Sequence, residues 1–155
     1  MLQSVKSLDI SFCSSVVHLG NLRSLRTLFV CPQTISLLEQ ITNCCDLHLI
    51  VEGDVAETLA AHYLESYQKL SLVNNSQIER LEGFPFLHSL TLLNLENLST
   101  IADLPFLRKL SVYGCPRLCA INLCSLPHLI ALDYGGKMLN GVTSGKEETL
   151  EFMET

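Results

Sequence analysis

Residues 67–75 read YQKLSLVNN and carry a short apolar motif, in which Tyr67, Leu70 and Leu72 fit the pattern apolar-x-x-Leu-x-apolar. The pattern occurs seven times in the 155 residues, with first positions at residues 5, 25, 44, 67, 87, 107 and 129. Subtracting successive starts gives spacings of 20, 19, 23, 20, 20 and 22 residues. Such a nearly constant spacing is typical of a chain built from short stacked repeats.

Each motif predicts a short strand. Alternate side chains of a strand lie on the same side of the backbone, so Leu70 and Leu72 are expected to face the core together. Apolar residues then recur at a spacing of three on the arm that returns the chain to the next strand, as at Ile78, Leu81 and Phe84. One such turn of chain cannot bury its apolar side alone, so neighbouring turns are expected to stack and close a common core.

The pattern resembles the leucine-rich repeat superfamily over roughly residues 2–136. In that family the position after the strand holds Asn or Cys, and a buried side chain of this kind is expected to hydrogen-bond the backbone inside the turn. The matching residues are Cys13, Asn75 and Cys115, and the pattern is broken by Gln33 and Leu95. The resemblance implies an α/β fold at residues 1–136, a right-handed solenoid with a parallel sheet on its concave face and short helices or 3-10 turns on its convex face.

Two early arms are expected to be helical. Thr34 can cap a helix, because Ser and Thr accept hydrogen bonds from the first backbone N–H groups of a helix. The inward positions of that helix are Ile35, Leu38 and Ile41. Asp54 and Glu57 form a capping-box pattern before a second helix. The apolar face of the second helix carries Val55, Leu59 and Tyr63.

The later arms and the C-terminal stretch have a different composition. Proline follows an apolar residue at Phe84-Pro85, Leu104-Pro105 and Leu126-Pro127. Proline disfavours helix in the residue before it, so these arms are predicted to be 3-10 turns or irregular coil. After the turn signal Gly135-Gly136, residues 137–155 lack the motif and are expected to form a polar, acidic tail or a partial cap. In the second case, the residues that fold back are Leu150, Phe152 and Met153.

The charge of the chain argues against polyanionic partners. Its formal net charge is −6, and its longest basic cluster is the pair Arg108-Lys109. Binding to nucleic acid or to an anionic membrane surface needs several clustered Lys or Arg, so neither partner is expected. No apolar run approaches the length of about 18 residues that a membrane span needs. The N-terminus lacks the pattern of a secretory signal, which favours an intracellular, cytoplasmic location.

The seven cysteines are interpreted as free thiols in a reducing compartment. Cys13, Cys44 and Cys115 occupy motif positions that are expected to face the core, where a thiol behaves as a small apolar group. Cys115, Cys119 and Cys124, with His128, have the residue types of a zinc site, but no tightly spaced second pair follows. No metal and no cofactor are therefore expected.

No motif of catalysis appears in the sequence. The chain has no glycine-rich phosphate loop and no HExxH motif. His48 and Asp46 are expected to share a strand face, but no Ser or Cys is placed with them as a credible nucleophile. The sequence therefore predicts a protein that is not an enzyme and has no catalytic residues.

The residues between the core positions are expected to form three rows across the outer face of the sheet. The first row is predicted to contain Thr27, Asp46 and Lys69, and the second to contain Phe29, His48 and Ser71. The third row is the candidate site, because Ile50, Val73, Leu93 and Tyr113 would form a continuous apolar stripe. Together with the nearby Phe29 and His48, these residues are the predicted partner-binding residues. The alternative is that these residue types reflect only the preference of β-branched and aromatic side chains for strands.

Two functional hypotheses follow. The first is a non-catalytic scaffold that binds a protein partner through the concave sheet face, which the family resemblance also implies. The second is a recognition or sensor segment of a larger protein. The segment Leu110–Leu118 resembles the cysteine-bearing repeats of plant immune receptors and of ubiquitin-ligase substrate receptors. Because the first repeat shows no polar cap, an end-to-end contact at that repeat is also expected.

Overall fold

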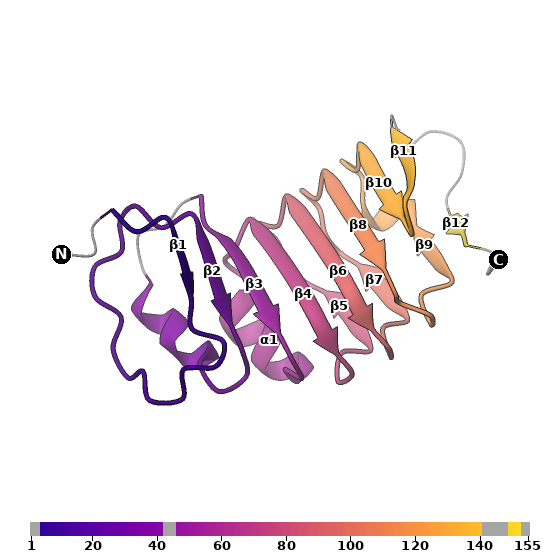
Figure 1. The fold of residues 1–155 in the computed structure, drawn as a ribbon. Helices are drawn as coiled ribbons and strands as arrows, with labels where there is room; N and C mark the ends of the chain where they lie inside the picture. The colour runs from indigo at the N-terminus through magenta and orange to yellow at the C-terminus, as the bar shows by residue number, and fades with distance from the viewer. Residues whose placement is uncertain (1–3, 42–45, 141–148, 153–155) are drawn as a thin grey trace.

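The computed structural model describes residues 4–41, 46–140 and 149–152. Within these residues the main sheet has eight strands, of which seven run parallel in chain order and the last, β11 (Lys137–Asn140), runs antiparallel (Figure 1). The parallel strands are β1 (Ser7–Asp9), β2 (Thr27–Val30), β3 (His48–Glu52), β4 (Lys69–Asn75), β6 (Ser89–Leu95), β8 (Lys109–Tyr113) and β10 (Ala131–Tyr134). The chain is therefore α/β with a mostly parallel sheet, as the sequence predicts.

A second layer of helices and short strands lies behind the main sheet (Figure 1). The early arms hold the 3-10 helix η1 (Ile35–Gln40) and the α-helix α1 (Glu57–Leu64). The later arms hold β5 (Arg80–Glu82), β7 (Thr100–Ala102), β9 (Ala120–Asn122) and the 3-10 turn η2 (Leu123–Ser125). The prediction of turns or coil is wrong for β5, β7 and β9. Pro85 and Pro105 follow β5 and β7, so the backbone before them is free to pair in parallel.

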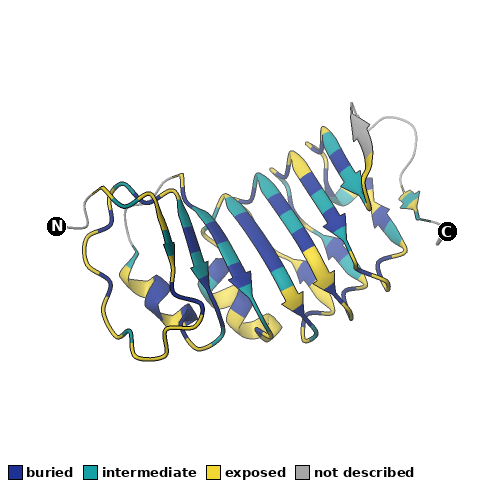
Figure 2. Cartoon of the chain, in the orientation of Figure 1, coloured by how far each residue is buried: buried dark blue, intermediate teal, exposed yellow. Residues whose placement is uncertain are grey.

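The core lies between the main sheet and this second layer. Strand pairing aligns one row of leucines across the sheet: Leu8, Leu28, Leu49, Leu70, Leu90, Leu110 and Leu132. From the second member onward, each is at most 1% exposed, and the buried bands along the strands are visible in Figure 2. Burial of each such side chain contributes about 1.5–3 kcal/mol relative to exposure. The alternation of the motif therefore predicts this core correctly.

The third motif has a different register from the predicted one. Leu49 pairs with Leu28 and Leu70, so the motif consists of Leu49 and Val51 rather than Leu47 and Leu49. Its first position is residue 46 instead of residue 44. With that start, the spacings become 20, 21, 21, 20, 20 and 22, by subtraction between the paired leucines. The motif is therefore more regular than the sequence suggests.

The first predicted helix begins after Thr34, as expected, whereas the second begins at Glu57, later than predicted. Residues 35–40 form a 3-10 helix, and the Thr34 hydroxyl accepts a hydrogen bond from the N–H of Cys31 at 3.1 Å instead of capping that helix. Helix α1 has Ala56 at its N-cap and no side-chain cap, so the capping-box prediction is wrong. Its face is also rotated from the predicted one, because Leu59 is 45% exposed. The buried residues of this helix are Ala60 and Leu64.

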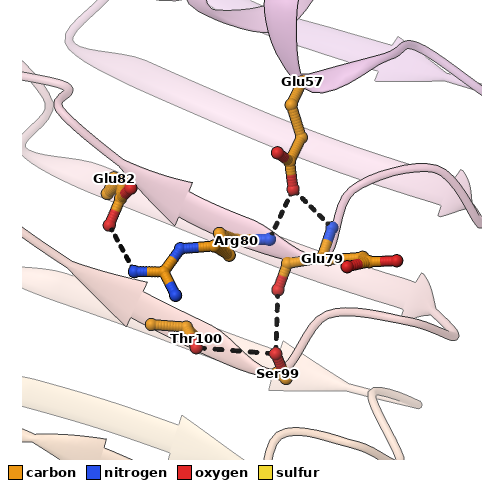
Figure 3. A network of polar contacts seen from close by, with 6 residues as sticks. All are labelled: Glu57, Glu79, Arg80, Glu82, Ser99 and Thr100. Atoms are coloured by element: carbon orange, nitrogen blue, oxygen red, sulfur yellow. Dashed lines mark hydrogen bonds and ion pairs between the residues drawn. The ribbon is translucent and has the colours of Figure 1, made fainter.

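The Glu57 carboxylate binds the next turn of chain instead of its own helix (Figure 3). Its Oε1 accepts the N–H groups of Glu79 and Arg80 at 2.8 and 2.7 Å. On the other side, the carbonyl of Glu79 accepts the N–H of Ser99 at 2.8 Å. The arm before β5 holds helix α1 rather than a strand. Glu57 of that helix thus supplies to β5 the hydrogen-bond acceptor that a neighbouring strand would supply.

Asn75 and Cys115 occupy buried positions at the ends of β4 and β8, as predicted. The Asn75 side chain donates to the carbonyls of Gly53 and Val55 and accepts from the N–H groups of Gln77 and Ile78. The same prediction is wrong for Cys13, which is exposed. Cys44 and Met153 lie outside the described residues.

The C-terminal stretch contains two strands that the motif does not predict. Gly135 and Gly136, with φ of 58° and 90°, connect β10 to β11 in the positive-φ conformation of a two-residue hairpin. Strand β12 (Thr149–Glu151) pairs antiparallel with β9. The Phe152 ring stacks on Tyr134 with 3.7 Å between ring centroids. Leu150 and Phe152 pack against the core, which is the folded-back arrangement.

None of the helices in the described part of the chain has the length and apolar character needed to cross a bilayer.

Candidate functional site

The main sheet turns one face towards the core, and the opposite face, here called the open face, carries the alternate residues of each strand. Strand pairing arranges this face in three rows. The first is Ser7, Thr27, His48, Lys69, Ser89, Lys109 and Ala131. The second is Asp9, Phe29, Ile50, Ser71, Thr91, Ser111 and Asp133, and the third contains Glu52, Val73, Leu93 and Tyr113.

The structure places the six predicted residues on this face, but two of them lie in other rows than predicted. Ile50 pairs with Phe29 and Ser71, in the second row. The neighbour of Val73 on β3 is the charged residue Glu52. His48 likewise moves to the first row, where it pairs with Thr27 and Lys69. The prediction of one continuous stripe is therefore wrong, because the register of β3 is shifted by two residues.

The apolar residues of the open face instead form two groups. Phe29 and Ile50 are neighbours on β2 and β3. Val73, Leu93 and Tyr113 are neighbours on β4, β6 and β8. Leu93 is the most open of the five, at 38% exposure, and the other four are half-buried. Apolar groups of this size with polar neighbours are typical of protein interaction surfaces.

A histidine–serine contact separates the two groups. His48 Nε2 lies 2.7 Å from Ser71 Oγ, and Ser71 is only 6% exposed. Burial lowers the pKa of His48, and the positive charge of Lys69 lowers it further. In the neutral tautomer whose Nε2 carries no proton, the ring accepts a hydrogen bond from the Ser71 hydroxyl. The sequence analysis places His48 and Ser71 in one row; in the structure they lie in neighbouring rows, because His48 pairs with Lys69 and Ser71 pairs with Ile50.

Asp46 does not complete a catalytic arrangement with this pair. Its carboxylate binds the ammonium group of Lys69 in the next strand, and this hydrogen bond is the main cause that lowers the pKa of Asp46. Ser71 lies in the middle of β4, which pairs with a strand on each side. The His48–Ser71 contact is thus built as a cross-strand hydrogen bond that fixes both side chains.

A second polar contact fixes Tyr113. Its hydroxyl donates a hydrogen bond to the Asp133 carboxylate on β10, and this bond is the main cause that raises the pKa of Tyr113. The sequence analysis missed Glu52, Ser71 and Asp133 as members of the site. The missing signal was the register of β3 for Glu52, and the cross-strand hydrogen bonds for Ser71 and Asp133.

A polar hollow of about 680 Å³ lies where β4, β6 and β8 end. Asn94 donates its side-chain N–H to Asn74 at 3.0 Å, and Asn74 donates to the carboxylate of Glu52 at 3.3 Å. Asn74, Asn94 and Gly114 share a positive φ of 54°, 56° and 63°. Asp54, on the same hollow, accepts the N–H of Ser76 at 2.6 Å. These bonds fix the turns that follow the strands.

The candidate zinc ligands are not brought together. Cys115 is buried at 3% exposure, whereas Cys119 and Cys124 are exposed. In residues 4–41, 46–140 and 149–152, no group of three or more His, Cys, Asp or Glu is placed to hold a metal ion.

A comparison of the chain with models of protein families, with curated proteins and with solved structures found no match.

Proposed function

We propose that the chain is a leucine-rich repeat solenoid that acts as a non-catalytic scaffold and binds a protein partner through the open face. The spacing of 20–22 residues between paired leucines supports the repeat assignment. The chain order of the parallel strands supports it as well. In this proposal the open face is the concave face of the solenoid.

The observation that carries the binding proposal is the group formed by Val73, Leu93 and Tyr113. Three apolar side chains on adjacent strands lie about 4.8 Å apart and offer a surface that water hydrates poorly. Aromatic residues supply much of the affinity at protein interfaces, and Tyr113 is held by its hydrogen bond to Asp133. The polar residues Glu52 and Thr91 border the group, as polar rims border interface cores.

The experiment that tests this proposal is affinity capture with the Val73→Glu/Leu93→Glu variant beside the parent chain. The matched control is Leu59→Glu/Ala61→Glu, which introduces the same two charges at exposed residues of α1, away from the open face. Urea denaturation of the three proteins checks that each is folded. Loss of captured proteins with the first variant alone is the expected result. Equal loss with the control, or no loss with either, would refute binding through the open face.

A second candidate function is a recognition segment that works within a larger protein. The supporting observation is the free edge of the sheet at β1, which among the described residues pairs with β2 alone. Phe12 and Val17, in the segment that follows β1, are 86% and 82% exposed. An exposed aromatic side chain at the first strand favours an end-to-end contact. Cross-linking from Phe12 replaced by a photoreactive analogue tests this contact, and the absence of any cross-linked species would argue against it.

A further inference from the structure

A second surface lies where the strands of the main sheet begin, and we call it the aromatic edge. It consists of Phe86, His88, Phe106, His128 and Ile130, from the segments that lead into β6, β8 and β10. Three of these rings lie in a row. The centroids of His88 and Phe106 are 6.3 Å apart with 20° between the ring planes, and those of Phe106 and His128 are 6.1 Å apart with 3° between the planes.

The apolar members of the aromatic edge are open to solvent. Phe86, Phe106 and Ile130 are 54%, 52% and 49% exposed. They are three of the seven large apolar side chains that are exposed in the described residues. Leu87 and Leu107, which directly follow the two phenylalanines, are fully buried. The two leucines therefore belong to the core, and the neighbouring rings point outward. An exposed cluster of this kind marks an interaction surface.

The charge at this edge is opposite to that of the whole chain. Arg108 and Lys109 lie two and three residues after Phe106 and are exposed. Within the described residues neither has a carboxylate partner, whereas Lys69 pairs with Asp46 and Arg80 pairs with Glu82. In a chain with a formal net charge of −6, this edge therefore presents two unpaired cations beside exposed rings. Such a combination favours a partner that is apolar and acidic.

We propose that the aromatic edge binds an acidic, extended peptide segment of a partner protein, with apolar side chains at alternate positions. Alternate side chains of an extended peptide are about 6.6–6.8 Å apart. That spacing is close to the 6.1 and 6.3 Å between the rings. A peptide that runs across the strands can therefore place one apolar side chain against each ring. Its carboxylates are attracted to Arg108 and Lys109 within the screening length of about 8 Å.

A nucleic acid fits this edge less well than a peptide. Single-stranded nucleic acids bind through a positively charged groove that follows many phosphates. In the part of the chain that the structure describes, the permanent cations that adjoin the aromatic edge in sequence are Arg108 and Lys109, and the net charge of −6 repels a polyanion. This surface is also separate from the central residues of the open face, so it extends the proposed function to a second contact.

The test uses fluorescence anisotropy of a labelled peptide with the sequence EFELEFELE, titrated with the full chain at 0.15 M salt. We expect saturable binding that Phe106→Ala weakens by about tenfold or more, since aromatic residues concentrate binding energy. Arg108→Glu is expected to weaken it several-fold and to reduce its salt dependence. Because Phe106 is half-exposed, its truncation leaves the core intact, which far-UV circular dichroism verifies.

Three controls make the test specific. Phe12→Ala and Arg117→Glu remove an exposed ring and an exposed cation elsewhere, and both are expected to leave binding unchanged. Val73→Glu/Leu93→Glu is also expected to leave it unchanged, which separates this surface from the open face. No binding, equal binding of the lysine peptide KFKLKFKLK, or equal loss with Phe12→Ala would overturn the proposal. Displacement of the peptide by a uridine 12-mer would assign the edge to nucleic acid and would likewise overturn it.

Discussion

Replacement of Asn75 by leucine tests how the turns after the strands are held. The Asn75 side chain is 2% exposed, donates to two carbonyl oxygens at 3.2 and 3.0 Å and accepts from two N–H groups at 2.7 and 2.9 Å. Leucine has the same branched arrangement of heavy atoms, and Leu95 occupies the paired position on β6 with no exposure. The substitution removes the hydrogen bonds, and the turn must widen slightly because methyl groups are larger than the amide atoms.

The expected magnitude follows from those four hydrogen bonds. At a net value of about 1 kcal/mol each, their loss costs about 4 kcal/mol, and the backbone groups left behind stay buried. Burial of the additional apolar surface of leucine stabilises the folded chain by about 1.5 kcal/mol. We therefore expect Asn75→Leu to lower the free energy of unfolding by roughly 2–3 kcal/mol. That change is a large fraction of the stability of a small domain.

The assay is equilibrium urea denaturation followed by far-UV circular dichroism. Asn97→Leu is the control, because the Asn97 amide donates a single hydrogen bond, to the carbonyl of Ser76 at 2.7 Å. This control is expected to cost about 1 kcal/mol. Amide hydrogen exchange at Gln77 and Ile78 gives a local readout, because both N–H groups lose their acceptor in Asn75→Leu. If Asn75→Leu costs no more than the control and leaves both amides protected, the argument for a hydrogen-bonded turn is refuted.

Three further predictions concern the core, the open face and the polar hollow. Leu90→Ala, at 1% exposure, is expected to cost about 2–5 kcal/mol in urea denaturation, whereas Leu93→Ala, at 38% exposure, should cost less than about 1 kcal/mol. Because the pKa of His48 is lowered from 6.5 in the folded chain, its contribution to stability is fully present above pH 6.5 and is lost as the pH falls through the lowered value. In His48→Gln, the free energy of unfolding should therefore fall less between pH 7.5 and pH 5 than in the parent chain. NMR titration of the ring in the parent chain should show the lowered pKa directly. Gly114→Ala should cost about 1–2 kcal/mol, because φ is 63° and the added carbon would lie 2.3 Å from Asn94 Oδ1; thermal denaturation beside Asn94→Ala/Gly114→Ala checks how much of this cost is the clash.

The parallel sheet and its buried leucines could be predicted from the sequence, but the register of one strand could not. In β3 and the residue before it, Leu47, Leu49 and Val51 alternate without interruption. A shift by one residue would move every side chain to the wrong face, so alternation excludes it. A shift by two leaves each residue on the same face, and only pairing with Leu28 and Leu70 decides between the two alignments. Because of that error, the sequence analysis assigned Ile50 and His48 to the wrong rows of the candidate site.

The prediction of a capping box was wrong for a related reason. The spacing of Asp54 and Glu57 is a local signal, and it assumes that the nearest unpaired N–H groups belong to the same helix. In the fold, the N–H groups of Glu79 and Arg80 lie within 2.8 Å of Glu57, although they are 22 and 23 residues away in the sequence. A neighbouring turn can therefore compete for a carboxylate, and no local pattern reports this competition.

The polar contacts of the open face bear on how strongly it can bind. Binding costs about 0.5–1.5 kcal/mol for each mobile side chain that must be fixed. On this face His48 is already held by Ser71, and Tyr113 is already held by Asp133. Both contacts join neighbouring strands, so they fix side chains without occupying the buried row of leucines. The leucine row can therefore stabilise the fold while these polar contacts hold the strands that carry Val73 and Tyr113. For the proposed binding through the open face, this arrangement lowers the entropy cost of fixing side chains.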